Sequence, residues 1–260
     1  MKNNGRQLWL PGIADTATMV AEAIAYLQIH EPPEGYFVGF SGGKDSICAL
    51  ELCRMAGVKH KAYYSCTRID PPEVVRFIRQ HYPDVEFLFP KMTFWEGIRK
   101  KAPPLRIKRW CCDVLKKDPS KDVPLKNRVM GIRAEESATR AARGRESVFR
   151  GNKSFKPIFC WTEYHVWDFI EGNWLPYPSL YDEGLHRLGC VICPFTMGKS
   201  PGKVRQREIS MQRWPGMWKA FERTCSDWFY STRLREGANM KEQKHETFEA
   251  YYQAYLRGFE

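Results

Sequence analysis

One six-residue segment combines the residue types that bind phosphate: Ser41, Gly42, Gly43, Lys44, Asp45 and Ser46. An apolar run at 36–40 precedes it, and a helical pattern at 47–56 follows it. A strand that turns through glycines into a helix N-terminus presents backbone N–H groups and the positive end of the helix dipole to an anion. The segment therefore predicts a phosphate site. The alternative is a glycine-rich turn between strand and helix that binds no ligand.

The spacing of this segment differs from that of the Walker A loop. The Walker motif requires four residues between its glycines and Ser or Thr after its Lys. Here Gly39 and Gly43 are one residue too close, and Asp45 follows Lys44. The segment instead resembles the pyrophosphate loop (PP-loop) of the ATP pyrophosphatases, which split ATP between its α- and β-phosphates.

The cysteines suggest a metal centre. Of the nine in the chain, Cys111 and Cys112 are adjacent, and Cys190 and Cys193 form a Cys-x-x-Cys that begins 190 − 112 = 78 residues later. Four thiolates hold either zinc or an iron–sulfur cluster. Adjacent cysteines suit a cluster, whose separate irons accept neighbouring thiolates, better than a zinc knuckle. We therefore predict a [4Fe–4S] cluster, with zinc as the alternative, on the four-cysteine set: Cys111, Cys112, Cys190 and Cys193.

The other cysteines give weaker signals. Cys48 and Cys53 lie on the apolar helix after the loop and are expected in the core. Cys66 is expected at a strand end, as part of the core or as a sulfur carrier. Cys160 and Cys225 have no obvious partners in the sequence. For the adjacent pair alone, the alternative to metal binding is two helical residues, one of them buried.

Alternating strand and helix patterns predict an α/β fold with a twisted parallel sheet and helices on both faces. Ligands of such sheets bind beyond the carboxyl ends of the strands. Segments 41–46, 67–70 and 131–133 are therefore expected to meet in one crevice. The pattern becomes helical and aromatic-rich after about residue 150. Strands are expected at 36–40, 60–65, 85–89 and 128–132, and helices at 15–30, 46–56, about 71–78 and 94–100.

Several polar residues are candidates for binding and catalysis in that crevice. Asp45 and Asp70 carry oxygen ligands suited to Mg²⁺. Arg133 has the geometry to pair bidentately with a phosphate. The alternative for Arg133, with Glu136 and Arg140, is an ion pair at the start of a helix. The predicted catalytic residues are Lys44, Asp45 and Arg133, and the predicted nucleotide site consists of residues 41–46 with Thr67, Asp70, Gly131 and Arg133.

The composition indicates where the protein is expected and which kinds of partner it would bind. The chain has 260 residues, 43% of them hydrophobic, and a formal charge of +11. No apolar run is long enough to span a bilayer, and no signal-peptide core follows Met1–Arg6. We therefore expect a cytoplasmic protein with reduced thiols and no membrane partner. The charge suggests nucleic acid as a partner, although solubility and the binding of small phosphates would explain it too.

A basic stretch in the C-terminal half is the candidate nucleic-acid site. Cations interleaved with aromatic rings suit the phosphate backbone and base stacking, whereas a solvated face is the plainer interpretation. Its members are Lys199, Lys203, Arg205, Arg207, Arg213, Trp214 and Trp218. Four other aromatic residues are expected in the core of the helical half: Trp161, Trp167, Phe169 and Trp174.

Together these residues resemble the phosphoadenosine-phosphosulfate (PAPS) reductase family, from about Trp9 to about Trp218. The resemblance implies one PAPS reductase-like PP-loop domain over 1–260, similar to the adenine nucleotide α-hydrolase and Rossmann folds. Residues 1–150 would form the nucleotide-binding core, and 151–260 a mainly helical extension with the second cysteine pair. The motifs that carry it are Ser41–Ser46, Asp70-Pro-Pro-Glu73, Trp110-Cys-Cys-Asp113, Gly131-Ile-Arg-Ala-Glu-Glu-Ser137, Pro157-Ile158, Trp161-Thr162, Val166-Trp167, Leu180–Gly184, Arg187-Leu-Gly-Cys190 and Cys193-Pro194.

One departure from the family bears on activity. Sulfonucleotide reductases end in a Glu-Cys-Gly-Leu/Ile-His segment whose cysteine attacks the sulfonate sulfur, whereas Leu234–Met240 and the residues after it contain no cysteine. The double cysteine with Cys-x-x-Cys is also similar to the sulfur-transfer ATPases of DNA phosphorothioation. The resemblance therefore implies adenylation and sulfur transfer to DNA or tRNA, with ATP, Mg²⁺ and a sulfur donor such as a cysteine desulfurase, in a possible oligomer. The alternatives are a sulfonucleotide reductase and a non-catalytic nucleotide-binding subunit.

Overall fold

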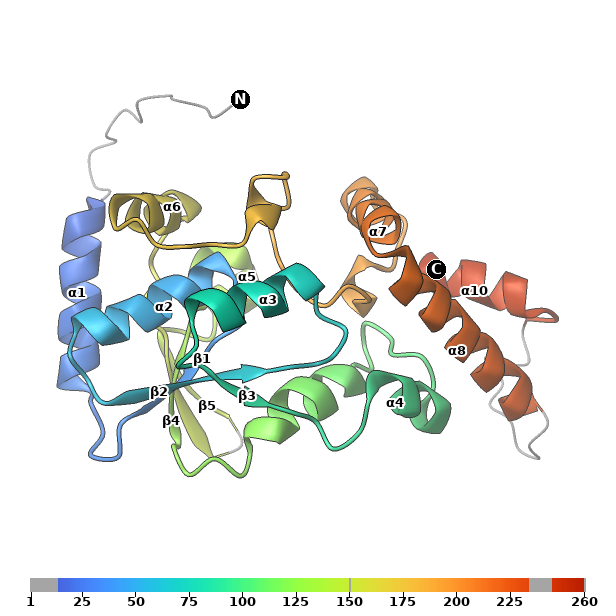
Figure 1. Cartoon of the computed structure of the whole chain (residues 1–260), viewed down its shortest axis with the longest axis horizontal. Helices are drawn as coiled ribbons and strands as arrows, with labels where there is room; N and C mark the ends of the chain where they lie inside the picture. The colour runs from blue at the N-terminus through green and yellow to red at the C-terminus, as the bar shows by residue number, and fades with distance from the viewer. Residues whose placement is uncertain (1–13, 150, 234–244, 260) are drawn as a thin grey trace. The chain divides into compact units, whose positions relative to one another are not determined.

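The computed structural model describes residues 14–149, 151–233 and 245–259. The predictions that fall on Met1–Arg6, Trp9 and Leu234–Met240 lie outside these residues. The chain divides into two compact units, and Figure 1 traces it from blue at the N-terminus to red at the C-terminus. Unit 1 comprises 1–62 and 125–177, and unit 2 comprises 63–124 and 178–260. The PP-loop segment therefore belongs to unit 1, and the four-cysteine set belongs to unit 2.

Six strands form a mostly parallel sheet in the order β3-β2-β1-β4-β6-β5. β1 pairs in parallel with β4, β4 with β6, and β2 with β3, whereas β5 and β6 are antiparallel. The predicted α/β class, with helices in the C-terminal part, is confirmed. The strands are β1 (Tyr36–Gly39), β2 (His60–Ser65), β3 (Glu86–Leu88), β4 (Asn127–Met130), β5 (Glu146–Phe149) and β6 (Asn152–Phe155).

In unit 1, helix α2 (Lys44–Met55) packs on β1 and β4 and contacts α1 (Thr16–Ile29) and α6 (Glu163–Gly172). The α2 side chains from Ile47 to Leu50 are fully buried, which fixes the helix that follows the PP-loop segment. Cys48 and Cys53 are also fully buried, so their expected place in the core is confirmed. Two short elements complete the unit, η3 (Ala134–Glu136) and α5 (Ala138–Ala141).

The hairpin β5–β6 was not predicted. Gly151, with φ of +73°, lies in its turn, and Lys153 pairs with Glu146 at 2.8 Å. In β6 only Phe155 is buried. Such short strands lack the apolar alternation that marks a strand in sequence, because pairing with β4 rather than a buried face holds β6 in the sheet.

Unit 2 is mainly helical around an aromatic core. Helix α8 (Pro215–Arg233) contacts α4 (Phe94–Lys101), α7 (Pro201–Arg213) and α10 (Phe248–Leu256). Phe221 of α8 is fully buried and stacks on Phe94 with ring centroids 6.0 Å apart. The remaining elements of this unit are α3 (Pro72–His81), the π-helix η1 (Cys112–Lys117) and the short turns η2 (Asp118–Ser120), η4 (Ser179–Tyr181) and η5 (Pro194–Thr196).

The predicted aromatic core of residues 161–174 is confirmed for two rings. Trp161 is 1% exposed and Phe169 is 2% exposed. The prediction is wrong for Trp174, which is 93% exposed. Trp174 follows the C-cap of α6 with φ of +51°, so the chain turns away from the helix and its side chain leaves the buried face. Along the described residues, no helix has both the length and the apolar character that a bilayer crossing requires.

Candidate functional site

The PP-loop segment is a compact turn between β1 and α2. Gly42 has φ of +71°, a conformation that glycine adopts without strain. The Ser46 hydroxyl donates to the carbonyl of Gly43 at 2.8 Å, and it accepts from the N–H of Ser41 at 3.1 Å. Gly43 is the N-cap of α2, and among the described residues no side chain caps this helix. The local structure therefore has the geometry of an anion site at a helix N-terminus.

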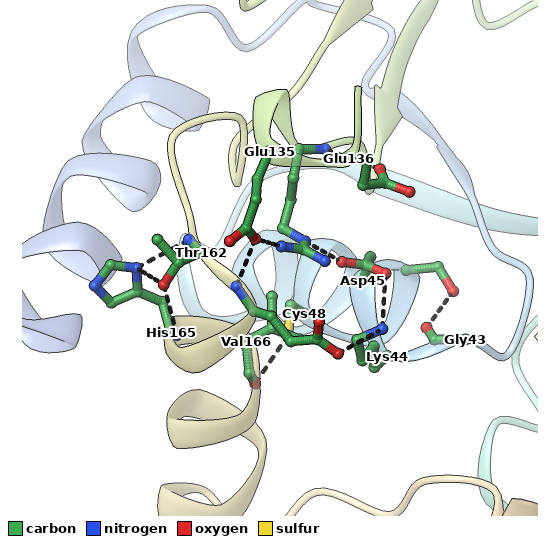
Figure 2. A network of polar contacts seen from close by, with 12 residues as sticks. Gly43, Lys44, Asp45, Cys48, Glu135, Glu136, Thr162, His165 and Val166 are labelled. Atoms are coloured by element: carbon green, nitrogen blue, oxygen red, sulfur yellow. Dashed lines mark hydrogen bonds and ion pairs between the residues drawn. The ribbon is translucent and has the colours of Figure 1, made fainter. Parts of the chain in front are cut away.

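Lys44 is the central cation of this turn. It is only 4% exposed, and its Nζ lies 3.5 Å from Glu163 Oε1 and 3.8 Å from Asp45 Oδ2 (Figure 2). Glu163 is the first residue of α6 and half-exposed. Thr162 caps this helix, accepting from the N–H of His165 at 3.4 Å. The buried ammonium is thus balanced by carboxylates from two helices.

Arg133 is the second buried cation, 4% exposed. Its Nε donates to Asp45 Oδ1 at 2.5 Å, and its Nη1 donates to Glu135. Burial by itself lowers the pKa of Arg133, but Asp45 and Glu135 outweigh it and the net shift is upward. Glu135 also accepts the N–H of Glu163 at 2.8 Å. This ion network joins the start of α2, the end of β4 and the start of α6.

Gly131 lets β4 approach the first turn of α2. A Cβ at this position would lie 2.3 Å from the carbonyl oxygen of Asp45 and 2.8 Å from the nitrogen of Ser46. These are backbone atoms, so no side-chain rotation would relieve the contact. Glycine is therefore required here by a close backbone approach. In unit 1 the structure brings Gly131 and Arg133 to the PP-loop segment, as the sequence predicts.

Two carboxylates of the network were missed by the sequence analysis, Glu135 and Glu163. The only local signal for Glu163 is the capping box that begins at Thr162, which places the acidic residue in the first turn of a helix. Its pairing with Lys44 is tertiary and has no sequence signature. Glu136 and Arg140 form the ion pair that was the alternative interpretation of this segment.

Thr67 and Asp70, the other predicted nucleotide-site residues, lie in unit 2 and contact a cysteine. Asp70 Oδ2 accepts from the Tyr64 hydroxyl at 2.6 Å and from the N–H of Thr67 at 2.9 Å. Asp70 Oδ1 and the Thr67 hydroxyl each lie 3.7 Å from Cys190 Sγ. Both residues therefore contact Cys190 of the four-cysteine set. Their part in nucleotide or Mg²⁺ binding stays a prediction.

The four-cysteine set belongs to unit 2, and its thiols influence one another's pKa. A hydrogen bond joins Cys111 and Cys112, which raises the pKa of Cys111 and lowers that of Cys112. Burial raises the pKa of Cys190 to about 11 and also raises that of Cys193. Cys112 opens the π-helix η1, an element that is frequent at functional sites. Cys190 and Cys193 also raise the pKa of Cys111, although the second pair begins 78 positions after Cys112.

Cations surround these thiols. Lys116 lies beside Cys190, whose thiolate form raises the pKa of the lysine. Lys116, Arg109 and Lys117 favour the thiolate of Cys112. Among the described residues, however, no three His, Cys, Asp or Glu side chains converge as they would around a single metal ion. Four thiols with cationic neighbours are the donor chemistry of a thiolate-bound centre, and the centre itself stays a proposal.

Part of the basic stretch at 199–218 serves the fold. Nη1 of Arg207 donates to three carbonyl oxygens, of Thr196, Gly198 and Leu256, at 3.0, 3.3 and 3.1 Å. Arg213 pairs with Glu73 and Glu183. The ring of Trp218 is 5% exposed. These side chains hold unit 2 together, which leaves Lys199, Lys203 and Arg205 as the exposed or half-exposed cations of the stretch.

Comparison with known proteins gives a family and a fold. Residues 35–196 match the model of the phosphoadenosine phosphosulfate reductase domain. A phosphoadenosine 5′-phosphosulfate reductase of Gloeobacter violaceus is 34% identical over 185 residues, which cover 64% of this chain and 75% of that protein. An uncharacterized protein of Methanocaldococcus jannaschii is 28% identical over 225 residues, 82% of this chain and 45% of the relative.

The crystal structure of the phosphoadenylyl-sulfate reductase of Candida auris has the same fold. It superposes with a TM-score of 0.51 at 19% identity, over 66% of this chain and 87% of that chain. The present chain spans about half the length of the first curated relatives that it matches.

Proposed function

Because the chain belongs to the phosphoadenosine phosphosulfate reductase domain family, we propose that it binds ATP and splits it between the α- and β-phosphates to adenylate an acceptor. The observation that carries this proposal is Lys44, a buried cation held in a glycine turn at the uncapped N-terminus of α2. A buried ammonium in that position fits a phosphate ligand. Membership of this family supports a nucleotide as the ligand. Cleavage between the α- and β-phosphates is our proposal.

The proposed reaction begins with an acceptor oxygen that attacks the α-phosphorus. The bridging P–O bond breaks, and pyrophosphate leaves with the electron pair. Lys44 and the loop N–H groups stabilise the charge on the leaving phosphates. Arg133, held through Asp45, fixes the first turn of α2. Mg²⁺, when bound, would neutralise phosphate charge, and the Asp45 carboxylate is the group of this loop that would hold it.

A sulfur nucleophile then displaces AMP from the adenylated acceptor, forming a bond from sulfur to the acceptor and breaking the bond from the acceptor to the AMP oxygen. The acceptor we propose is nucleic acid, and the sulfur would come from a donor such as a cysteine desulfurase. The four-cysteine set would hold a [4Fe–4S] cluster, whose chemistry is to bind and deliver sulfur. In this chain Thr67, Asp70 and Lys116 orient Cys190 for that role.

Reduction of a sulfonucleotide is the second candidate, favoured by the names of several relatives, among them the adenosine 5′-phosphosulfate reductase of Allochromatium vinosum, 36% identical over 136 residues. Reduction requires an accessible thiol to attack the sulfonate sulfur. Cys225, the last cysteine of this sequence, is completely buried in α8, and burial raises its pKa well above the ordinary value. This thiol is therefore a poor nucleophile for that attack.

Calorimetry with ATP and adenylyl sulfate, together with a sulfite assay, tests the proposal. ATP should bind the native chain, Lys44→Ala should abolish binding, and the exposed Lys59→Ala in the same unit should leave it unchanged. Unchanged ATP affinity in Lys44→Ala would refute the site. Sulfite released from adenylyl sulfate in the presence of an external thiol would favour the reductase instead. ATP binding without AMP, with acceptors present, would indicate a non-catalytic nucleotide-binding subunit.

A further inference from the structure

The positive charge of this chain is concentrated in one segment of unit 2. Residues 99–117 contain eight Lys and Arg against a single acidic residue, Asp113, so 19 residues carry +7 of the net +11. All eight cationic residues are exposed by accessible surface, although the Lys116 ammonium lies beside Cys190. We name this segment the 99–117 surface; its cations are Arg99, Lys100, Lys101, Arg106, Lys108, Arg109, Lys116 and Lys117.

Intramolecular ion pairs do not account for this charge. Lys117 pairs with Asp113 at 2.9 Å, and Arg99 lies 3.9 Å from Asp227 with both side chains more than half exposed. No acidic partner is found for Lys101, Arg106 or Lys108 among the described residues. Exposed cations without acidic partners repel one another, so this arrangement lowers the stability of the free protein. A polyanion would relieve the repulsion.

The backbone of the surface is well anchored although its side chains are exposed. The Trp110 indole donates to the carbonyl of Ala102 at 2.9 Å, and its ring stacks on Phe94. The Tyr255 hydroxyl donates to the carbonyl of Pro104 at 2.8 Å. Leu105 and Lys108 exchange two backbone hydrogen bonds of 3.1 and 3.3 Å. These contacts hold a tight turn with Arg106 and Ile107 at its tip.

The same surface carries apolar and aromatic groups that suit bases. Ile107 is 89% exposed at the tip of the turn. The guanidinium of Arg109 lies 4.6 Å from the ring centroid of Phe195, which is 45% exposed. A recess beside the turn is lined by Ile107, Arg109, Cys112, Asp113 and Lys117. A cationic surface with an apolar tip and a guanidinium–aromatic stack offers both phosphate contacts and a stacking platform.

We infer that the 99–117 surface binds single-stranded or looped nucleic acid and brings it to the recess that Cys112 lines. The inference rests on the proposed function, because it supplies the acceptor of that reaction. It moves the nucleic-acid site from the stretch at 199–218, where Arg207 and Arg213 hold the fold, to the segment around the first cysteine pair. An acidic peptide would satisfy the cations but would leave Ile107 and the Arg109–Phe195 stack unused.

Fluorescence anisotropy of a labelled single-stranded oligonucleotide, without ATP and over a range of salt concentrations, tests the inference. The variant Lys101→Gln/Arg106→Gln/Lys108→Gln removes three cations without acidic partners. The matched control, Arg205→Gln/Lys219→Gln/Arg223→Gln, removes three exposed cations of α7 and α8 in the same unit. Each lost phosphate contact lowers the salt slope by about 0.7 on a single strand, so the first variant should lose about 2 from the slope and the control should resemble the native chain.

Equal losses in the two triple variants would overturn the inference, as would absence of binding by the native chain at low salt. Ile107→Ser keeps every charge, and it should weaken binding about five- to tenfold at an unchanged salt slope if the tip packs on a base or sugar. If polyglutamate displaced the labelled oligonucleotide as well as unlabelled oligonucleotide does, the surface would bind any polyanion. That result would also overturn the assignment to nucleic acid.

The proposed ATP reaction and the proposed nucleic-acid surface can be refuted independently of each other. Lys44→Ala should bind the oligonucleotide as the native chain does, because Lys44 belongs to the ATP site of unit 1. A native chain that binds the oligonucleotide but neither binds nor cleaves ATP would reject the proposed function and keep the 99–117 surface. ATP cleavage by a native chain that does not bind the oligonucleotide would reject the 99–117 surface and keep the proposed function.

Discussion

Replacing Gly131 by alanine tests whether the close approach of β4 to α2 builds the ATP site. A Cβ at this position would lie 2.3 Å from the carbonyl oxygen of Asp45, whereas ordinary contacts of a Cβ begin at 3.4 Å. The two backbones must therefore separate by 3.4 − 2.3 = 1.1 Å. Overpacking of this kind costs about 1–3 kcal/mol, and a misplacement of about 1 Å at a reacting site costs on the order of 100-fold in rate.

The matched control is Gly172→Ala in the same unit. Gly172 ends α6, and a Cβ there would meet nothing within 4 Å. Alanine is a better helix former than glycine, so this variant should be neutral or stabilised by up to about 1 kcal/mol. The pair therefore applies one chemical change at a tight position and at an open one.

Thermal unfolding followed by tryptophan fluorescence, and ATP titration by calorimetry, give the two readouts. For Gly131→Ala we expect a midpoint several degrees lower, because 1 kcal/mol shifts it by about 2–4 °C in a chain of this size. We also expect ATP affinity to fall by at least about tenfold. A variant as stable as Gly172→Ala that binds ATP as the native chain does would refute the argument from backbone approach.

Three further predictions concern Glu163, the four-cysteine set and Arg207. Glu163→Gln should raise ATP affinity about fivefold at low salt, because a carboxylate near Lys44 repels phosphate by about 1 kcal/mol in a solvated site; weaker binding would show that the carboxylate instead positions Lys44. Anaerobically purified protein should be brown and contain iron and sulfide, and each Cys→Ser change in the four-cysteine set should bleach it, whereas stoichiometric zinc without sulfide contradicts the cluster. Arg207→Ala should lower stability by about 1–3 kcal/mol, with the exposed Arg205→Ala as the neutral control; equal unfolding midpoints for the two variants would remove the structural role of Arg207.

Local sequence signals predicted the first half of the fold well. The glycine pair before an apolar helix, and strands flanked by helix caps, located β1, α2, β2 and α3 to within a few residues. The same signals failed at β5–β6, where the short strands are held by pairing in the sheet rather than by a buried apolar face. Trp174 was misplaced for a related reason, because its exposure depends on where α6 ends rather than on its residue type.

Tertiary partners limited the prediction of the site. Gly131 and Arg133 were identified from their place at a strand end, but the carboxylates that hold Lys44 and Arg133 come from α6 and from η3. The prediction for the basic stretch at 199–218 depended on charge alone, and the carbonyl partners of Arg207 are visible only in the fold. The sequence analysis did not select the 99–117 surface, although eight cations lie in that segment.

The bond that the protein cleaves in ATP is the most direct test of the central proposal. ATP labelled in its β-phosphate can be incubated with the anaerobic protein, Mg²⁺ and single-stranded nucleic acid, and the products separated by chromatography. We predict that the label leaves in pyrophosphate in step with AMP, and that Lys44→Ala releases neither product. Label recovered in ADP would contradict the account, because it would place the cleavage at the γ-phosphate instead of between the α- and β-phosphates.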